Sequence, residues 1–136
     1  MLYYLRPFIV AKYVTQAHGS QCALITAFLY LFHNRISPQT LLMEFGSKVA
    51  HLVELVSHEE NEGEAFRNKE AFLVKLCDLI VQLEWNQGVS SPTLNEDVRE
   101  IVGLYTSVGK YYGFTTLSHR LHDLCYPPKN QSHTPQ

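Results

Sequence analysis

The stretch from Cys22 to Phe32 is the most apolar segment of this 136-residue chain, and it strongly limits what the chain can fold into. Its apolar side chains would occur on nearly every side of a helix, and a helix of that kind lies inside a protein or a membrane. The stretch has about half of the roughly 20 residues that span a bilayer. We therefore expect a helix over about 21–34 that is central to the fold and does not cross a membrane.

Helix signals also occur along the rest of the chain, and no segment alternates apolar and polar residues as a strand would. Ser37 and Pro38 form a typical helix start, while Gly46 and Gly113 are expected helix ends. The expected helices cover about residues 3–17, 21–34, 38–45, 47–58, 64–86, 95–112 and 118–125. Residues 59–63 are predicted to form a solvated loop, and residues 86–92 a turn-rich connection.

These helices predict an all-α fold, a single compact bundle of six or seven helices over residues 1–125. The segment 126–136, with three prolines and few apolar residues, is predicted to be a flexible tail.

Charge and cysteine usage exclude several classes of protein. The 11 Lys and Arg residues are scattered among 13 Asp and Glu residues, which gives a net charge of −2 and no basic stripe for nucleic acid. The cysteines are three widely separated residues, Cys22, Cys77 and Cys125. No zinc ribbon or disulfide framework is expected from them, and the pattern suits a reducing cytoplasm. The first residues do not resemble a signal peptide, so we expect a cytoplasmic location.

Two polar clusters have the composition of metal or catalytic sites. His51, Glu54 and His58 share one face of a predicted helix, as metal ligands can. That face lies opposite an apolar stripe within residues 49–56, which favours a solvated polar face. The same reasoning applies to a cluster near the C-terminus, formed by His119, His122 and Asp123.

Asp78 breaks the local pattern more clearly. It lies in the apolar run Ala71–Leu83, where only Lys75 is also charged. A buried carboxylate needs a partner or a metal ion. Burial alone favours pairing of Asp78 with Lys75 or with nearby backbone, and it favours His33, at the end of the first apolar run, as a satisfied core histidine.

The segment FGSKVAHLVELVSH (45–58), followed by Arg67 and then LVKLCDLIVQL (73–83), resembles the hydrolase domain of RelA/SpoT-type proteins and their small single-domain relatives. The resemblance covers roughly residues 5–86 and is strongest over 38–83. It implies an all-helical HD-type domain. The activity that it implies is metal-dependent removal of the 3′-pyrophosphate from guanosine tetra- and pentaphosphate, with manganese.

In that family the metal is held by an early His, a His-Asp pair and a late Asp. The resemblance places His33 on the His of the pair and Asp78 on the late Asp, so these two are the expected remnant of a metal site. Asn34 replaces the Asp of the pair, and Ala11 replaces the early His. In a shifted alignment, His18 is a possible third ligand.

Two further departures weaken the implied activity. The family's two acidic residues after the pair have no counterpart, and Gln82 replaces an asparagine that follows the late Asp. A hydrolytic metal site must neutralise the ion and acidify a bound water. His33 and Asp78 supply only one negative charge, which is poor for that purpose.

The sequence therefore predicts a catalytically degenerate HD-family domain that acts by binding a protein partner or a purine nucleotide, without a cofactor. Arg35 and Lys75 could meet the phosphates of a nucleotide. The alternative is an active phosphohydrolase that uses manganese on His18, His33 and Asp78. A third candidate is an oligomerisation module, whose partner surface would include the aromatic residues Tyr3, Tyr4, Tyr111 and Tyr112.

Overall fold

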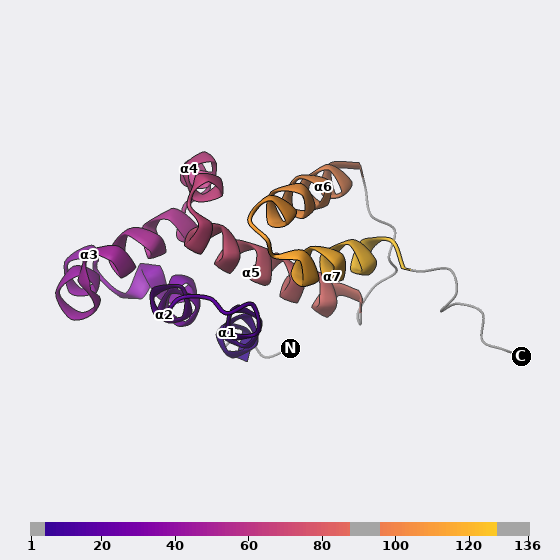
Figure 1. Cartoon of the computed structure of the whole chain (residues 1–136). Coiled ribbons are helices and arrows are strands. Elements are labelled where there is room, and N and C mark those ends of the chain that lie inside the picture. Colours follow the sequence, from indigo (N-terminus) through magenta and orange to yellow (C-terminus); the bar gives the residue numbers. More distant parts are fainter. Residues whose placement is uncertain (1–4, 88–95, 128–136) are drawn as a thin grey trace, which may run out of the picture.

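Helix α5 (Lys69–Gln87) is the centre of the fold in a computed structural model, which describes residues 5–87 and 96–127. It passes through the middle of the molecule and contacts each of the other α-helices (Figure 1). Phe72, Leu76 and Ile80 on this helix are completely buried. The second apolar run of the sequence, and not the expected helix over 21–34, is therefore the central one.

The described residues form seven α-helices and two 3-10 segments, and they contain no strand, which confirms the predicted all-α class. The α-helices are α1 (Arg6–Gln16), α2 (Gln21–Leu29), α3 (Pro38–Ser57), α4 (Glu62–Arg67), α5, α6 (Glu96–Tyr111) and α7 (Thr115–Cys125). The 3-10 segments are η2 (Tyr30–Arg35) and η3 (Glu59–Asn61). Among these helices, none has the length and apolar character that crossing a bilayer requires.

The turn between α1 and α2 is held close to α5. A Cβ atom added to Gly19 would lie 2.5 Å from Val14 Cγ1 and 2.9 Å from Leu73 Cδ2, so only glycine fits there. Ser20 then caps α2, and its Oγ accepts a hydrogen bond from the backbone N–H of Ala23 at 3.1 Å. Phe28 on α2 remains 36% exposed. Helix α2 covers α5 on one side only, which is why it is not the central helix.

The two helices predicted over 38–45 and 47–58 are the two parts of α3, which are separated by a kink at Gly46, where the sequence predicts a break. Gly46 has φ 90° and ψ 167°, a conformation that favours glycine. Ser37 caps the first part through the N–H of Thr40, at 3.0 Å. Leu41, Val49 and Val53 form a small apolar cluster beside the main core.

The predicted loop over 59–63 and the predicted single helix over 64–86 are wrong in detail. Residues 59–61 form η3, and α4 begins at Glu62. The helix is interrupted at Asn68, between α4 and α5. Asn68 Oδ1 accepts hydrogen bonds from the backbone N–H groups of Glu70 at 3.0 Å and Ala71 at 3.1 Å. Asn68 thus caps α5, and an asparagine followed by an acidic first turn is the sequence signal for this start.

Helices α6 and α7 close the core on the other side of α5. Gly113 has φ 89° and separates them, as predicted. Helix α7 begins at Thr115, earlier than the predicted residue 118. The two helices are very close at Gly109, where an added Cβ would lie 2.3 Å from Ser118 Oγ. The predicted cap at Asn95, most of the connection over 86–92 and the tail from residue 128 lie outside the described residues.

Glu70 links α5 to α2 and α3, and this link predicts a dependence of stability on pH. Its carboxylate accepts a hydrogen bond from Ser20 Oγ and lies 3.0 Å from Lys48 Nζ. Burial acts to raise the pKa of Glu70, but the bonds from Ser20 and Lys48 outweigh it and lower the pKa. The Glu70 carboxyl group therefore binds a proton more readily in the unfolded chain than in the folded one. The stability that Glu70 contributes is present at neutral pH and is lost as the pH falls through its folded-state pKa.

The Glu70→Gln variant should therefore show a shallower loss of stability on acidification than the wild type. Urea unfolding at a series of pH values below neutral measures this slope. Glu60→Gln, at an exposed position, is the matched control and should leave the slope almost unchanged. Equal slopes for the wild type and Glu70→Gln would contradict the assignment.

Candidate functional site

The Asp78 carboxylate is held by side chains from three elements. Arg6, at the start of α1, donates from Nε to Oδ1 at 2.8 Å and from Nη2 to Oδ2 at 2.9 Å. Tyr30, at the start of η2, donates its hydroxyl hydrogen to Oδ1. Gln82, one turn further along α5, donates from Nε2 to Oδ2 at 2.7 Å. The ion pair is mostly shielded from solvent, because the side chains of Arg6 and Asp78 are 20% and 16% exposed.

This arrangement uses most of the hydrogen-bonding capacity of the carboxylate. An ionised carboxyl group has about four acceptor positions, and two bonds from Arg6 with one each from Tyr30 and Gln82 make four. Burial and the neighbouring charge of Asp78 raise the pKa of Tyr30, so its hydroxyl remains a donor. The geometry is that of a bidentate arginine–carboxylate pair, which is among the stronger polar contacts in proteins.

The charge partner of Asp78 is therefore Arg6, and not Lys75 as burial alone suggested. Arg6 is 72 residues away in the sequence, so no helical spacing could reveal the pair. The one available signal was an arginine next to Pro7, at the start of the helix that the resemblance aligns with the family's metal-binding region. Helix α1 brings this arginine to Asp78 on α5, the residue that the resemblance aligns with a metal ligand.

His33 lies near this network but faces another histidine. Its Nδ1 is 3.1 Å from the carbonyl oxygen of Tyr30, and its ring packs edge-on against the His58 ring with 5.2 Å between centroids. Nε2 of His58 is in turn 3.6 Å from a carboxylate oxygen of Glu54. Asn34, which replaces the Asp of the family's pair, is exposed. The contact between His33 and His58 was not predicted, because the two residues come from different elements.

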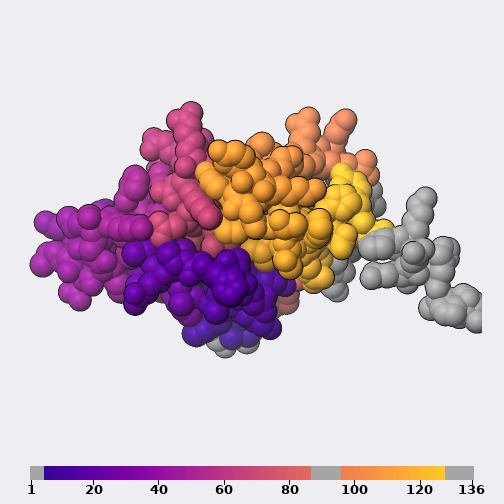
Figure 2. All heavy atoms as spheres, in the orientation of Figure 1, coloured from indigo at the N-terminus to yellow at the C-terminus, as the bar shows by residue number. Residues whose placement is uncertain are grey.

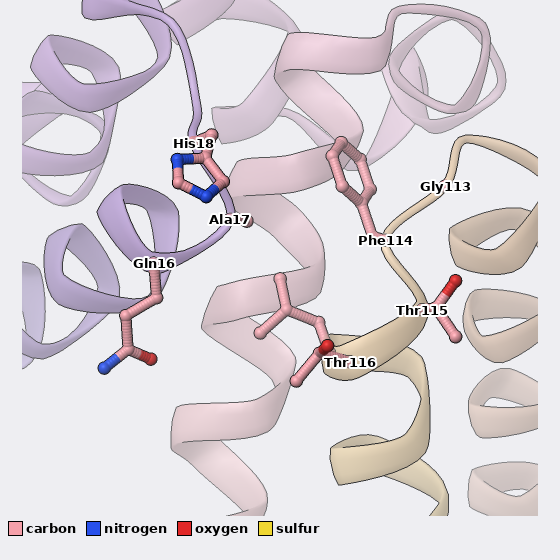
Figure 3. Close-up of a pocket in the computed structure, with 8 residues that line it drawn as sticks. Gln16, Ala17, His18, Gly113, Phe114, Thr115 and Thr116 are labelled. Carbon is pink, nitrogen blue, oxygen red and sulfur yellow. The ribbon is translucent and has the colours of Figure 1, made fainter.

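The residues predicted as metal ligands are not gathered together. In the part of the chain that the structure describes, no group of three or more His, Cys, Asp or Glu side chains could hold a metal ion. His18 lines a cavity of about 260 Å³ between the α1–α2 and α6–α7 turns, where Figure 3 shows it across from Phe114. Asp78 lines a different cavity, of about 150 Å³, together with Lys75.

These residues do not fit a hydrolytic divalent cation. A metal ion at Asp78 would have to displace donors that already satisfy both carboxylate oxygens, and it would be repelled by the Arg6 guanidinium. Ala11, which the resemblance aligns with the early His, is 4% exposed and packs in the core. Asn34 supplies no negative charge.

The other predicted residues lie at the surface or at the edge of a cavity. Lys75 is partly buried and lines the cavity at Asp78, together with Glu62 and Tyr105, whereas Arg35 is exposed and is not among the residues of that cavity. The two polar clusters follow the prediction of solvated faces, except for the partly buried His58. Their exposed members are His51, Glu54, His119, His122 and Asp123.

Helix α5 carries a further carboxylate network, at Glu84, that sequence reasoning missed. Glu84 accepts hydrogen bonds from the Tyr13 hydroxyl of α1 and from the Arg120 guanidinium of α7, whose Nε lies at 3.0 Å. Burial and the Glu84 carboxylate raise the pKa of Tyr13. Glu70, Asp78 and Glu84 thus each connect α5 to a neighbouring helix. The common pattern indicates that the acidic residues of α5 stabilise the packing of the bundle.

Cys77 is the most buried of the described cysteines. Cys22, Cys77 and Cys125 are all free thiols. Cys77 is completely buried next to Asp78, and burial followed by the charge of that carboxylate raises the pKa of its thiol. A thiol in that state is a core side chain rather than a nucleophile.

Comparison with known proteins does not assign the chain to a group. No model of a protein family matches the sequence, and no curated protein sequence is detectably similar to it.

Proposed function

We propose that this chain is a non-catalytic, HD-type helical module that acts by binding a protein partner. The observation that carries the proposal is the position of Arg6. Its guanidinium donates two hydrogen bonds to the Asp78 carboxylate. In the hydrolases that the sequence resembles, the matching aspartate is a metal ligand. A carboxylate that is already neutralised by an internal cation contributes little to binding a second cation, so the fold is retained while the chemistry is lost.

A protein partner is favoured over a nucleotide by the size of the cavity at Asp78. Its volume of about 150 Å³ is below the roughly 300–1,000 Å³ of typical ligand pockets. Among the described residues, Lys75 is the basic side chain that lines it. A guanine nucleotide with two pyrophosphate groups would need more space and more positive charge.

Exposed apolar side chains support a protein-binding role. Met43 is 78% exposed and Leu42 50% exposed, on the part of α3 before the Gly46 kink. On α1, Phe8 is 61% exposed and packs edge-on against Phe28 of α2, with 5.4 Å between ring centroids. Phe8 and Phe28 thus form an exposed aromatic pair, and adjoining exposed apolar side chains are typical of protein contact sites.

The direct test is a hydrolysis assay on the purified full chain with guanosine tetraphosphate and manganese, combined with metal analysis. We expect no release of pyrophosphate and no stoichiometric manganese. Turnover that the His33→Ala variant abolishes would overturn the proposal and support the alternative, a metal-dependent phosphohydrolase.

A nucleotide-binding role predicts that the purified chain binds guanosine tetraphosphate but does not hydrolyse it. Saturable binding of guanosine tetraphosphate without hydrolysis, weakened by Lys75→Ala, would show that the partner is a nucleotide and not a protein. Lys12→Ala is the matched control, because Lys12 is an exposed lysine of α1 that is not among the residues lining the Asp78 cavity.

A further inference from the structure

Helix α6 has apolar side chains on two of its faces. The inward face contacts the core through Val98, Val102, Tyr105, Gly109 and Tyr112. A second row, here called the outer stripe, consists of Ile101, Leu104, Val108 and Tyr111. This row adjoins the inward face, because Val108 is partly buried against the core and Ile101 also lines the cavity at Asp78. Ile101 is 46% exposed, Leu104 52% and Tyr111 83%. A helix whose partners all lie inside the fold needs only the inward face.

The spacing of the outer stripe is that of a helix-pairing surface. Its members follow one another after three, four and three residues, which is the alternation of the apolar seam in a two-helix coiled coil. In Figures 1 and 2, α6 lies along the upper edge of the molecule, with α7 in front of it. Another helix could therefore reach it from outside.

Tyr111 and Tyr112 divide between the two faces. Tyr112 donates its hydroxyl hydrogen to the carbonyl oxygen of Phe66 at 2.6 Å and belongs to the core. Tyr111 packs edge-on against Tyr112 and is otherwise open to solvent. Of the aromatic residues predicted to meet a partner, only Tyr111 is suitably exposed in the described part, since Tyr3 and Tyr4 lie outside it.

The polar residues beside the outer stripe carry opposite charges at the two ends of α6. This row, which repeats at helical spacing on one flank, consists of Glu96, Glu100, Gly103, Ser107 and Lys110, all of them exposed. Its acidic end is the N-terminus of the helix and its basic end is the C-terminus. A Cβ added to Gly103 would meet nothing within 4 Å, so the middle of the flank is open.

We propose that the outer stripe of α6 is a self-association surface, on which α6 of a second copy of the chain packs in the antiparallel direction. A two-fold axis beside residue 106 would place Ile101 opposite the second copy's Tyr111, and Leu104 opposite its Val108. Lys110 of one copy would then lie about two residues, roughly 3 Å along the axis, from Glu100 of the other.

Charge complementarity selects this partner and this direction. The antiparallel arrangement brings the acidic end of each flank to the basic end of the other, and it also opposes the two helix dipoles favourably. A parallel arrangement would bring Glu100 to Glu100 and Lys110 to Lys110, and like charges at these positions repel. The chain thus carries both halves of a self-complementary, two-fold interface.

The test is sedimentation equilibrium of the full chain over about 1 µM to about 1 mM, because a contact limited to one short helix is expected to be weak. We expect a monomer–dimer equilibrium. Leu104→Glu should raise the dissociation constant at least about tenfold, because it places a charge in the centre of the seam. Its exposed position means that the monomer should stay folded, which circular dichroism checks.

Charge exchange tests the antiparallel direction. Glu100→Lys and Lys110→Glu should each weaken the dimer, whereas the double variant should restore it, because it exchanges the two ends of the same pair. The single-variant effects should shrink at high salt. If the double variant loses as much dimer affinity as the two single variants lose in sum, the proposed direction is wrong.

Leu5→Glu is the matched control, since Leu5 is an exposed leucine, 42% accessible, that lies far from α6 in the sequence and should leave the dimer unchanged. A strict monomer at the highest concentration would overturn the proposal. So would a dimer that Leu5→Glu disrupts and Leu104→Glu does not. This outcome is independent of the manganese and hydrolysis assays, so failure of one proposal does not imply failure of the other.

Discussion

Replacing Asp78 with Ala is expected to lower the free energy of unfolding by about 2–4 kcal/mol. The substitution leaves the Arg6 guanidinium, 20% exposed, without its carboxylate, and it also removes the acceptor for Tyr30 and Gln82. Breaking one side of a fully buried ion pair costs about 3–5 kcal/mol, and the partial exposure of this pair reduces that figure. Urea unfolding followed by circular dichroism measures the change.

A double-mutant cycle separates the contribution of the Arg6–Asp78 ion pair to the free energy of unfolding from the other effects of each substitution. Arg6→Ala should also destabilise the fold, and the double variant should be less unstable than the two single effects added together, with a coupling of about 1–3 kcal/mol. Asp123→Ala is the matched control, because the Asp123 side chain is 54% exposed, and its effect should stay within about 0.5 kcal/mol. Additive effects of the Arg6 and Asp78 substitutions would show that the pair does not stabilise the fold.

Replacing Phe72 with Ala is expected to lower the free energy of unfolding by about 3–5 kcal/mol, the largest effect predicted here. Phe72 of α5 is completely buried, and its ring contacts three other aromatic rings. Those of Phe66, Tyr105 and Tyr112 lie at centroid distances of 5.2, 5.6 and 5.6 Å. Truncation opens a cavity where α4, α5 and α6 meet, and rigid rings can fill little of it.

The loss should appear as a lower urea midpoint with an unchanged slope, because the surface exposed on unfolding hardly changes. Typical domains have only about 5–15 kcal/mol of stability, so Phe72→Ala should be close to unfolding at physiological temperature. Phe45→Ala is the matched control, since that side chain is 40% exposed, and it should cost no more than about 1 kcal/mol. Equal effects of the two substitutions would contradict the assignment of the core to the aromatic cluster on α5.

The fold class was predictable because helix signals are local. Ser37 with Pro38 marked the start of α3, and Gly46 and Gly113 marked its kink and the end of α6, each through backbone preferences that act within a few residues. The prediction of the central helix was wrong, because apolar character on all sides does not say which helix the others surround. Asn68 was missed as a cap because a single asparagine inside a helical pattern is a weak signal.

The candidate site was predictable only in part. Asp78 and His33 could be singled out because a charged and a titratable residue interrupt apolar runs. Their partners could not, because Arg6 and His58 are placed by the packing of whole helices. The resemblance to RelA/SpoT-type hydrolases predicted a metal-ligand role for His33 and Asp78, and that role stays a prediction. The resemblance could not show that Arg6, in the N-terminal helix, forms an ion pair with the carboxylate of Asp78.

The pairing of Asp78 gives this aspartate a structural role in the fold. Three carboxylates on α5 each join it to other helices: Glu70 contacts α2 and α3, Asp78 contacts α1 and η2, and Glu84 contacts α1 and α7. In this arrangement the aspartate stabilises the bundle whether or not a ligand is present. Retention of the aspartate therefore does not require a retained reaction.

The most direct test of this account is the thermal unfolding midpoint of the wild-type chain measured with increasing manganese. A ligand that binds only the folded state raises the midpoint in proportion to the logarithm of its concentration once its site is saturated. With Arg6 on the Asp78 carboxylate, we predict no change in the midpoint up to millimolar manganese. A rise that the Asp78→Asn variant abolishes would show that the aspartate binds the metal after all, and it would contradict the account.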